Sequence, residues 1–321
     1  MDDPTFTARL EGHRPELRIH CYRMLGSLDD SEDLVQETFL RAWRGRERFG
    51  ADGRWELRAW LYRIATNACL DVLRRRPPRV MPQDVAEPGD PSVAPSPPAD
   101  LPWLQPYPTL AEDVVARETI ELAFIAAIQH LPPRQRAVLI LRDVLGWTAA
   151  DAAEHLDLTV AAVNSALQRA RATLRDRLGE RTEWSRGSAR SEEERELLRR
   201  YVDAHERADT DALAALLRED ARLTMPPHPV WYHGREAIRV AAAQGFDPDF
   251  GHLRTVATEA NCQPAVAHYL RAPGETAYRP LALDVLRIED GLVAEITSFV
   301  SPELFAAFGL ADEFSADRRS T

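Results

Sequence analysis

The chain has 321 residues, of which 45% are hydrophobic, and a formal net charge of −11 at pH 7. This length exceeds that of one compact domain, so we expect two or three domains with buried cores. The negative charge argues against a protein that binds nucleic acid over its whole surface. The charge is uneven, however, because residues 54–79 hold seven arginines against two acidic residues and residues 191–321 hold 14 against 23. Any contact with DNA should therefore lie before the acidic C-terminal part.

Cysteine usage and hydropathy indicate the compartment. The three cysteines, Cys21, Cys69 and Cys262, are scattered without the spacing of a metal site, which is typical of a reduced protein with buried thiols. The chain has no charged start followed by an apolar run, and no stretch long enough to span a bilayer. We therefore expect a cytoplasmic protein with no membrane partner, no metal and no cofactor.

Residues 5–79 carry apolar residues at helical spacing and predict three amphipathic helices. The first ends near Gly26, and the second begins at Asp29 or Ser31. A loop rich in glycine and arginine is expected from Gly45 to Gly53, before the third helix. The outer face of the second helix is polar and mostly acidic, with Asp30, Glu32, Asp33, Gln36 and Glu37.

Residues 77–110 are dense in proline and serine, which predicts an extended linker without a packed core. One segment of it, DLPWLQPYP, is less polar because Trp103, Leu104 and Tyr107 stand between prolines. This segment is interpreted either as an element that docks on a partner or as a hydrophobic clip onto the protein's own domain.

Residues 147–177 predict a helix-turn-helix. Thr148 and Asp151 form a capping box at the start of a first short helix, and Thr159 can cap a second. The apolar residues of the second helix form one buried stripe of Val163, Leu167, Ala170 and Leu174. Its opposite face can bind base edges or phosphates through Asn164, Ser165, Gln168, Arg169, Arg171 and Arg175. Candidate phosphate contacts ahead of the motif are Arg134, Arg136 and Arg142.

A polar hinge follows residue 181, and the character of the chain then changes. Amphipathic helices come first. From about Leu253 to Val300 there are four runs that predict strands, with turns at Pro273-Gly274 and Asp290-Gly291. Helices followed by strands at hairpin spacing predict an α+β domain with a curved antiparallel sheet.

Two motif sets resemble the extracytoplasmic-function (ECF) group of bacterial RNA polymerase sigma factors, within the sigma-70 family. The acidic helix DDSEDLVQETFLRAW, followed by WLYRIATNACLDVLRRR, resembles their region 2. The helix-turn-helix and the preceding LPPRQRAVLILRDVLGWT resemble their region 4. The resemblance implies region 2 at residues 6–79 and region 4 at residues 113–180. Between them, residues 80–112 would be an acidic linker that threads near the polymerase active-site channel.

The same resemblance implies roles for individual residues. The surface that docks on core RNA polymerase, at the clamp helices of its largest subunit, would be Asp30, Glu32, Asp33, Gln36 and Glu37. The −10 promoter element would be bound by Trp55, Arg63, Asn67, Arg74, Arg75 and Arg76. Phe49 and Trp55 would help to hold an unstacked base, although both could equally belong to the core. The −35 element would be bound by Arg134, Thr159, Asn164, Ser165, Gln168, Arg169, Arg171 and Arg175.

Residues 191–310 resemble the SnoaL-like family, a relative of ketosteroid isomerase, in their order of elements and their WYHGREAI segment. The resemblance implies a cone-shaped fold that encloses a pocket. Candidate lining residues are Tyr201, His205, Trp231, Tyr232, His268 and Asp284. His268 or Asp284 could act as a base there, but a lone ionisable residue on a strand is more often structural, and the fold alone does not choose.

We therefore expect a multidomain protein with two all-α sigma modules and a C-terminal α+β SnoaL-like domain. Its expected function is that of a sigma factor, not an enzyme, that directs core RNA polymerase to promoter DNA. The C-terminal domain is expected to modulate this activity through contact with the sigma modules, with a small ligand as a further partner. Two alternatives stay open. One is a helix-turn-helix regulator that does not act through core polymerase, and the other is a pocket enzyme of the ketosteroid-isomerase class in the C-terminal domain.

Overall fold

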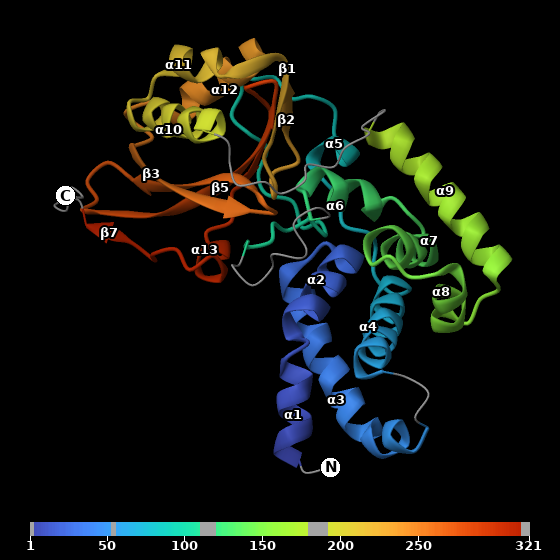
Figure 1. Ribbon diagram of the computed structural model, residues 1–321. Coiled ribbons are helices and arrows are strands. Elements are labelled where there is room, and N and C mark those ends of the chain that lie inside the picture. The colour runs from blue at the N-terminus through green and yellow to red at the C-terminus, as the bar shows by residue number, and fades with distance from the viewer. Residues whose placement is uncertain (1–2, 53–55, 110–119, 179–191, 316–321) are drawn as a thin grey trace. The chain divides into compact units, whose positions relative to one another are not determined.

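The computed structural model describes residues 3–52, 56–109, 120–178 and 192–315 (Figure 1). The chain divides into two compact units, residues 1–79 with 110–186 and residues 80–109 with 187–321. The first unit is helical and the second is built on a sheet, so the predicted combination of all-α modules with an α+β domain is confirmed. No helix in the described part of the chain is both long and apolar enough to cross a membrane.

The helical unit begins with an N-terminal module whose helix ends follow from local chemistry. The single first helix predicted up to Gly26 is wrong, because the chain forms two helices there, Asp3–Glu11 and Arg14–Leu25. The second of them ends at Gly26 as predicted, where a φ of 65° lies in the left-handed region that glycine adopts without strain. The third begins at Leu28, because Ser27 Oγ accepts a hydrogen bond from the backbone N of Asp30 at 3.2 Å. The helices are α1 (Asp3–Glu11), α2 (Arg14–Leu25), α3 (Leu28–Asp52) and α4 (Leu57–Leu73).

The loop predicted from Gly45 to Gly53 is wrong over residues 45–52, because α3 continues to Asp52. The rings of Phe49 and Trp60 stack with their centroids 4.6 Å apart. A Cβ atom at residue 45 would lie 3.1 Å from the Trp60 ring, so Gly45 allows α4 to approach closely. The packing of these rings offsets the roughly 1 kcal/mol by which a glycine weakens a helix interior.

The second helical module contains the predicted helix-turn-helix. Thr148 and Asp151 form the capping box of α8, with Asp151 N donating to Thr148 Oγ1 at 3.1 Å. Asp157 closes the turn at a φ of 52°, which aspartate tolerates better than most residues. Thr159 Oγ1 accepts from the backbone N of Ala162 at 3.1 Å, so its predicted cap is confirmed. The elements are α6 (Leu122–Gln129), α7 (Pro133–Leu139), the π-helical turn η3 (Ile140–Val144), α8 (Ala149–Leu156) and α9 (Val160–Leu178).

The second unit is an α+β domain in which the helices between residues 192 and 245 gather on one side of a sheet (Figure 1). The strand order is β2-β1-β6-β5-β4-β3, with β1 parallel to β6, the other pairs antiparallel, and β7 added to β5. The four predicted strand runs correspond to β3, β4, β5 and β6. The helices are α10 (Glu192–Glu206), α11 (Thr210–Ala215), α12 (Arg235–Gly245) and α13 (Leu304–Ala307). The strands are β1 (Leu217–Thr224), β2 (Trp231–His233), β3 (His252–Ala260), β4 (Gln263–Arg271), β5 (Ala277–Glu289), β6 (Leu292–Phe299) and β7 (Phe314–Ser315).

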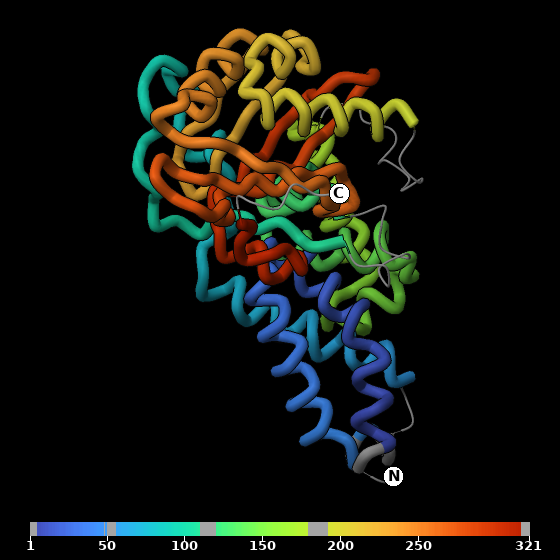
Figure 2. The backbone as a smooth tube through the Cα atoms, turned by 90° about the vertical axis from the view of Figure 1, so that its left-hand side faces the viewer, coloured from blue at the N-terminus to red at the C-terminus, as the bar shows by residue number. Residues whose placement is uncertain are grey.

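Residues 80–109 are not the linker without a packed core that the sequence predicted. They form one unit with the α+β domain and run along it (Figure 2). Trp103, Leu104 and Tyr107 are 9%, 1% and 0% exposed, so these side chains are packed away from water. The prolines remove backbone donors and favour extended chain, while the apolar side chains between them bury against the domain. The hydrophobic-clip interpretation of this segment therefore fits the structure. A short helix, α5 (Pro82–Val85), lies near its start.

Candidate functional site

Asp30 is the least available of the acidic residues predicted to dock on a partner. Its carboxylate pairs with Arg76 at 2.6 Å and with Arg79. Burial on its own would raise the pKa of Asp30, but the two guanidinium groups outweigh burial and lower it. The pairing also shows that Arg76, predicted to bind the −10 element, contacts the start of α3.

The rest of the acidic face of α3 is more open. Glu32 pairs with Arg14 at 2.9 Å and Glu37 with Arg41 at 2.7 Å, both as partly exposed pairs. Such pairs contribute about 1 kcal/mol or less and exchange readily for an external partner. The side chains of Asp33 and Gln36 are exposed.

Leu40 is a candidate contact that sequence reasoning missed. It is 52% exposed, although leucine is normally buried. It lies seven residues after Asp33 and four after Gln36, so all three share one face of α3. The signal that could have found it is a leucine on the polar side of an otherwise well-formed amphipathic helix.

The residues predicted to bind the −10 element lie along α4 and at its end. Asn67 is exposed on α4, and Arg63 pairs with Asp157 at 3.1 Å. The helix ends at Leu73, so the exposed arginines 74–76 follow its C-terminal turn. Trp55 lies outside the described residues, and Phe49 is engaged by Trp60.

The helix α9 presents the predicted −35 face. Its apolar stripe of Val163, Leu167, Ala170 and Leu174 is buried, as predicted. Asn164, Gln168 and Arg175 are exposed on the other side, whereas Ser165 accepts a hydrogen bond from exposed Arg169 at 2.6 Å. Arg171 makes two hydrogen bonds to Asp143, at 2.7 and 2.8 Å. Of the residues that precede the motif, Arg134 is exposed, as is Thr159 at the start of α9.

Arg136 does not contact phosphate, and its prediction as a phosphate contact is wrong. The side chain is 1% exposed. Its guanidinium donates to Gln129 Oε1 and to the Gln129 carbonyl, each at 2.7 Å, and also to the carbonyl of Met24 on α2. Burial lowers the pKa of Arg136 to about 10. The arginine therefore ties α7 of the second helical module to α2 of the first.

A buried histidine pair strengthens this contact between the two helical modules. His20 on α2 lies 2.9 Å from Thr66 Oγ1 on α4, and His155 on α8 lies 3.3 Å from the same oxygen. Burial lowers the pKa of His20 to about 3 and that of His155 to about 4. Both imidazoles are therefore neutral at pH 7, and protonation of either ring is unfavourable while it stays buried. We call this contact, formed by His20, Thr66, His155 and Arg136, the module seam.

The module seam predicts a loss of stability in mild acid. The unfolded chain binds protons at histidine near pH 6.5, whereas the folded chain does so only near pH 3 to 4. Stability is therefore fully present above pH 6.5 and falls as the pH drops. One pKa unit corresponds to about 1.4 kcal/mol, so a change from pH 6.5 to pH 5 should cost up to about 2 kcal/mol for each histidine.

Urea unfolding of the full chain at pH 7 and at pH 5 measures this effect. His155→Gln should reduce the difference between the two pH values, because glutamine does not titrate. The exposed His252 provides a control, since His252→Gln should leave the difference unchanged. An identical pH dependence in His155→Gln and in the unaltered chain would contradict the assignment.

The α+β domain contains a cavity of about 400 Å³. Most of its lining is apolar, including Leu213, Ile238, Phe246 and Leu253. Of the residues predicted to line a pocket, the structure brings together Tyr201, His205, Tyr232, His268 and Asp284. Trp231 does not line it, and its Nε1 instead donates to the Ala86 carbonyl at 2.8 Å.

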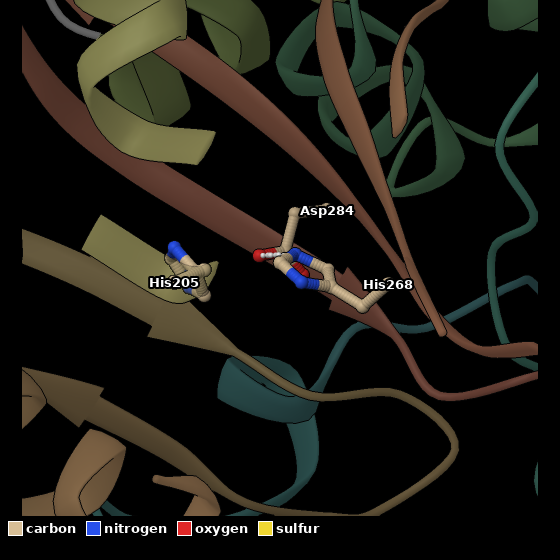
Figure 3. A group of neighbouring side chains, drawn as sticks. All are labelled: His205, His268 and Asp284. Carbon is tan, nitrogen blue, oxygen red and sulfur yellow. Dashed lines mark hydrogen bonds and ion pairs between the residues drawn. The ribbon is translucent and has the colours of Figure 1, made fainter. Parts of the chain in front are cut away.

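The polar end of the cavity is built around Asp284. Its Oδ2 atom accepts hydrogen bonds from the Tyr201 hydroxyl at 2.7 Å and from His268 Nε2 at 2.8 Å. Figure 3 shows the His268 ring against this carboxylate, with His205 beside them. His205 Nδ1 lies 2.9 Å from the Tyr201 carbonyl. A carbonyl only accepts, so Nδ1 carries a proton and Nε2 of the neutral ring is an acceptor.

The charges at this end follow from burial and pairing. Burial would raise the pKa of Asp284, but the charge and hydrogen bond of His268 outweigh it and lower the pKa to about 2. Burial, aided by the charge of His268, lowers the pKa of His205 to about 4. Burial also raises the pKa of the Tyr201 hydroxyl well above its usual value. At pH 7 Asp284 is therefore a carboxylate, Tyr201 is protonated and His205 is neutral.

His205, His268 and Asp284 each offer a nitrogen or oxygen atom within 4.8 Å of the others. Two imidazoles and a carboxylate are a donor set that transition metals accept. In the described structure, however, Asp284 Oδ2 already receives two hydrogen bonds. A metal ion at that oxygen would have to displace Tyr201 and His268 from it.

The segment that connects the two helical modules also reaches this cavity. Ala94 and Pro95 line it. Gln244 Nε2, on α12, donates to the Pro91 carbonyl at 2.7 Å, and the backbone N of Ala99 donates to the Pro227 carbonyl at 3.0 Å. Part of the cavity wall is thus formed by chain that lies between residues 79 and 110.

Comparison with known proteins matches each part of the chain to a family. The family model for Sigma-70 region 2 matches residues 10–77, that for Sigma-70 region 4 matches residues 121–174, and that for the SnoaL-like domain matches residues 198–296. The ECF RNA polymerase sigma factor SigG of Mycobacterium tuberculosis is 43% identical over 321 residues, which cover 96% of this chain and 84% of SigG. The probable ECF RNA polymerase sigma factor SigI of the same species is 27% identical over 309 residues, 94% of each chain.

A solved structure shows the same fold over nearly the whole chain. The crystal structure of the M. tuberculosis extracytoplasmic function sigma factor SigJ superposes with a TM-score of 0.63, at 20% identity, and covers 95% of this chain and 100% of SigJ. The two helical modules, the fused α+β domain and the extent of the similarity to SigG agree with one another. The chain belongs to the ECF RNA polymerase sigma factors, which direct RNA polymerase to promoters, and it carries a fused SnoaL-like domain.

Proposed function

We propose that this sigma factor is held in a closed state by its own SnoaL-like domain, which captures the linker between the two sigma modules. The observation that carries the proposal is that residues 80–109 form one compact unit with residues 187–321. A linker that must thread near the polymerase active-site channel is not available while it lies on another domain. Capture should therefore lower promoter-specific transcription, and release should raise it.

The module seam supports the same closed state. The −10 and −35 elements are about 25 base pairs apart, which at about 3.4 Å per base pair corresponds to roughly 85 Å. A compact unit of some 160 residues has a radius of gyration of only about 15 Å. Two modules joined through Arg136 and the His20–Thr66–His155 cluster therefore cannot occupy both elements. They must separate for initiation.

We call the state in which the two helical modules have separated the open state. For it we assign contacts mainly from which side chains are exposed. Core RNA polymerase would be bound by the α3 face that contains Asp33, Gln36 and Leu40, with Glu32, Glu37 and Asp30 released from their ion pairs. The −10 element would be bound by Asn67 and by Arg63, Arg74, Arg75 and Arg76. The family resemblance adds Trp55, which lies outside the described residues. The −35 element would be read by Asn164, Ser165, Gln168 and Arg169, with Arg134, Thr159, Arg171 and Arg175 as backbone contacts. With these partners the protein would act in the cytoplasm.

The SnoaL-like domain would act by binding and not by catalysis. An isomerase of this class needs a hydrogen-bond donor for the developing oxyanion, opposite its base. Here the Tyr201 hydroxyl and the His268 Nε2–H both donate to Asp284. These two donors are thus engaged by the carboxylate, which disfavours a pocket enzyme that would use either of them.

Run-off transcription with core RNA polymerase and a genomic promoter library tests the proposed function. The full chain should yield promoter-specific transcripts. Gln168→Ala should alter the −35 sequence preference, whereas Arg175→Ala should weaken all promoters about equally and reduce the salt dependence of binding. Duplex DNA binding without any transcript would instead support the helix-turn-helix regulator that does not act through core polymerase.

A further inference from the structure

The cavity of the SnoaL-like domain presents a hydrogen-bond acceptor that the fold leaves open. His205 is 9% exposed and lines the cavity. Its Nδ1–H donates to the Tyr201 carbonyl at 2.9 Å, and burial keeps the ring neutral, so Nε2 is an acceptor. Within the described part of the chain, no residue donates to this nitrogen. A buried acceptor without a donor costs free energy, and a ligand that brings a donor removes that cost.

The other polar side chains of the cavity both donate and accept, and their charges compensate. Asp284 accepts from the Tyr201 hydroxyl and from His268 Nε2, and Ser298 also donates to it. The positive charge of His268 keeps Asp284 ionised, so two opposite charges lie 2.8 Å apart. Tyr232 is a further hydroxyl-bearing residue of the wall. These groups can thus form hydrogen bonds in both directions, but they offer a ligand no free counter-charge.

From these contacts we infer that the cavity binds a neutral, largely apolar small molecule that carries a hydroxyl group. A hydroxyl both donates and accepts, so it can donate to His205 Nε2 and accept from a hydroxyl of the wall. The apolar body packs against Leu213, Ile238 and Phe246. The cavity volume of about 400 Å³ suits a ligand of one to three fused rings.

Other head groups fit this cavity less well. A ketone accepts but does not donate, so it leaves His205 Nε2 buried without a donor. An ammonium group can donate to that nitrogen, but its charge leaves water for a site where Asp284 is already paired with His268. A carboxylate has the same desolvation cost and brings no donor. The hydroxyl is therefore the head group that satisfies the open acceptor without burying a new charge.

This inference rests on the proposed function and gives it a signal, because the captured linker forms part of the cavity wall. Ala94 and Pro95 line the cavity, and Gln244 holds the linker through the Pro91 and Val93 carbonyls at 2.7 and 3.3 Å. A ligand in the cavity has this part of the wall only while the linker is captured. Its binding therefore favours the captured state and should lower transcription.

Four probes with the same apolar body separate the head groups. Isothermal titration of the full chain at pH 7.5 compares 2-adamantanol, 2-adamantanone, 2-aminoadamantane and adamantane-2-carboxylate. The alcohol should bind roughly tenfold more tightly than each of the others, which is the effect of one buried acceptor left without a donor or of one charge buried without a partner. A ketone, amine or carboxylate that binds as tightly as the alcohol, or no binding of any probe, would overturn the inference.

Two variants locate the hydroxyl and the apolar body. His205→Phe keeps a ring but removes the acceptor, so the alcohol and the ketone should then bind within about twofold of each other. This ratio is measured within one protein, so a loss of stability affects both probes alike. Ala242→Phe should abolish binding of every probe, because Ala242 lines the cavity, whereas Ala243→Phe at an exposed position of the same helix should not. An alcohol preference that persists in His205→Phe, or binding that survives Ala242→Phe, would contradict the assignment.

The coupling to the linker is measured by run-off transcription. A saturating concentration of 2-adamantanol should lower promoter-specific transcription by the full chain severalfold and should have no effect on Ala242→Phe. No response of the full chain, or a rise, would contradict the coupling.

A metal ion is the competing occupant of the same side chains. Tight Zn²⁺ binding that is lost in His205→Phe and that excludes the alcohol would assign His205 to a metal site and overturn the inference. The titrations contain neither polymerase nor DNA, and linker capture is tested without any ligand. Failure of the titrations therefore leaves linker capture standing, and failure of linker capture is seen separately.

Discussion

Gly89→Val is expected to raise promoter-specific run-off transcription severalfold at equal protein concentration. The backbone N of Gly89 donates to the Trp231 carbonyl at 2.8 Å, so this residue lies directly on β2. A Cβ atom at residue 89 would lie 2.7 Å from Val230 Cγ2 and 3.3 Å from the Tyr232 ring. Both neighbours are buried and cannot move aside freely. The substituted linker must therefore leave the strand.

The size of the effect follows from the contacts that are lost. Displacement breaks the bond from Gly89 to Trp231 and the bond from Trp231 Nε1 to the Ala86 carbonyl. The two hydrogen bonds contribute about 1 kcal/mol each, and overpacking in a linker that stays on the strand costs about 1–3 kcal/mol. By either route the captured state loses roughly 2 kcal/mol, which is enough to shift a captured linker from mostly bound to substantially free.

Two further variants make the test specific. Glu87→Val adds the same side chain two residues away at an exposed position, and transcription should stay unchanged. Asn261→Gly keeps the left-handed backbone of Asn261, whose φ is 54°, but removes the Oδ1 atom that accepts from the backbone N of Tyr107 at 2.8 Å. It should release the other end of the linker and also raise transcription. Unchanged or lower promoter-specific transcription by both Gly89→Val and Asn261→Gly would contradict the proposal that the SnoaL-like domain captures the linker.

Local signals in the sequence were sufficient for the helical modules. The Thr148–Asp151 capping box, the cap at Thr159 and the buried stripe of α9 all rely on contacts within a few residues, which spacing alone reports. The strand runs of the α+β domain followed in the same way from alternation and turn residues. Gly45 predicts a loop but lies within α3, because its role is to leave room for the Trp60 ring of another helix.

Contacts between distant residues could not be predicted. The sequence predicts that Arg136 is a surface phosphate contact. The side chain is instead buried and donates to the carbonyls of Gln129 and Met24, and Met24 lies 112 residues away. The linker has the composition of a free segment, and its capture depends on Asn261 and Trp231, which lie more than a hundred residues downstream. A high proline content indicates that a segment does not form a helix or a sheet by itself. It does not identify the surface against which the segment packs.

The candidate pocket could be predicted in part. Tyr201, His205, His268 and Asp284 were singled out from face and residue type, and the structure brings them to one end of a cavity. The sequence could not predict which atoms of these side chains form hydrogen bonds. The direction of each hydrogen bond decides whether the cavity accepts or donates, and it depends on the approach of α10 to β4 and β5.

The largest loss of function is expected from Leu40→Gln, which should lower the affinity for core RNA polymerase at least tenfold. Leu40 is 52% exposed and shares a face of α3 with Asp33 and Gln36. Protein interfaces place an apolar centre within a polar rim, and loss of a central apolar contact costs about 2 kcal/mol or more. Glutamine adds no charge, so the electrostatic attraction of the acidic face stays the same.

The same substitution should leave the fold intact, because a change at an exposed helix position usually alters stability by about 0.5 kcal/mol or less. Fluorescence-detected binding of labelled chain to core polymerase gives the affinity, and thermal unfolding verifies the fold. Leu40→Met keeps the apolar contact and should bind within about threefold of the unaltered chain. If Leu40→Gln binds core polymerase as tightly as Leu40→Met, the exposed leucine is not part of the docking surface, and the acidic residues alone must account for binding.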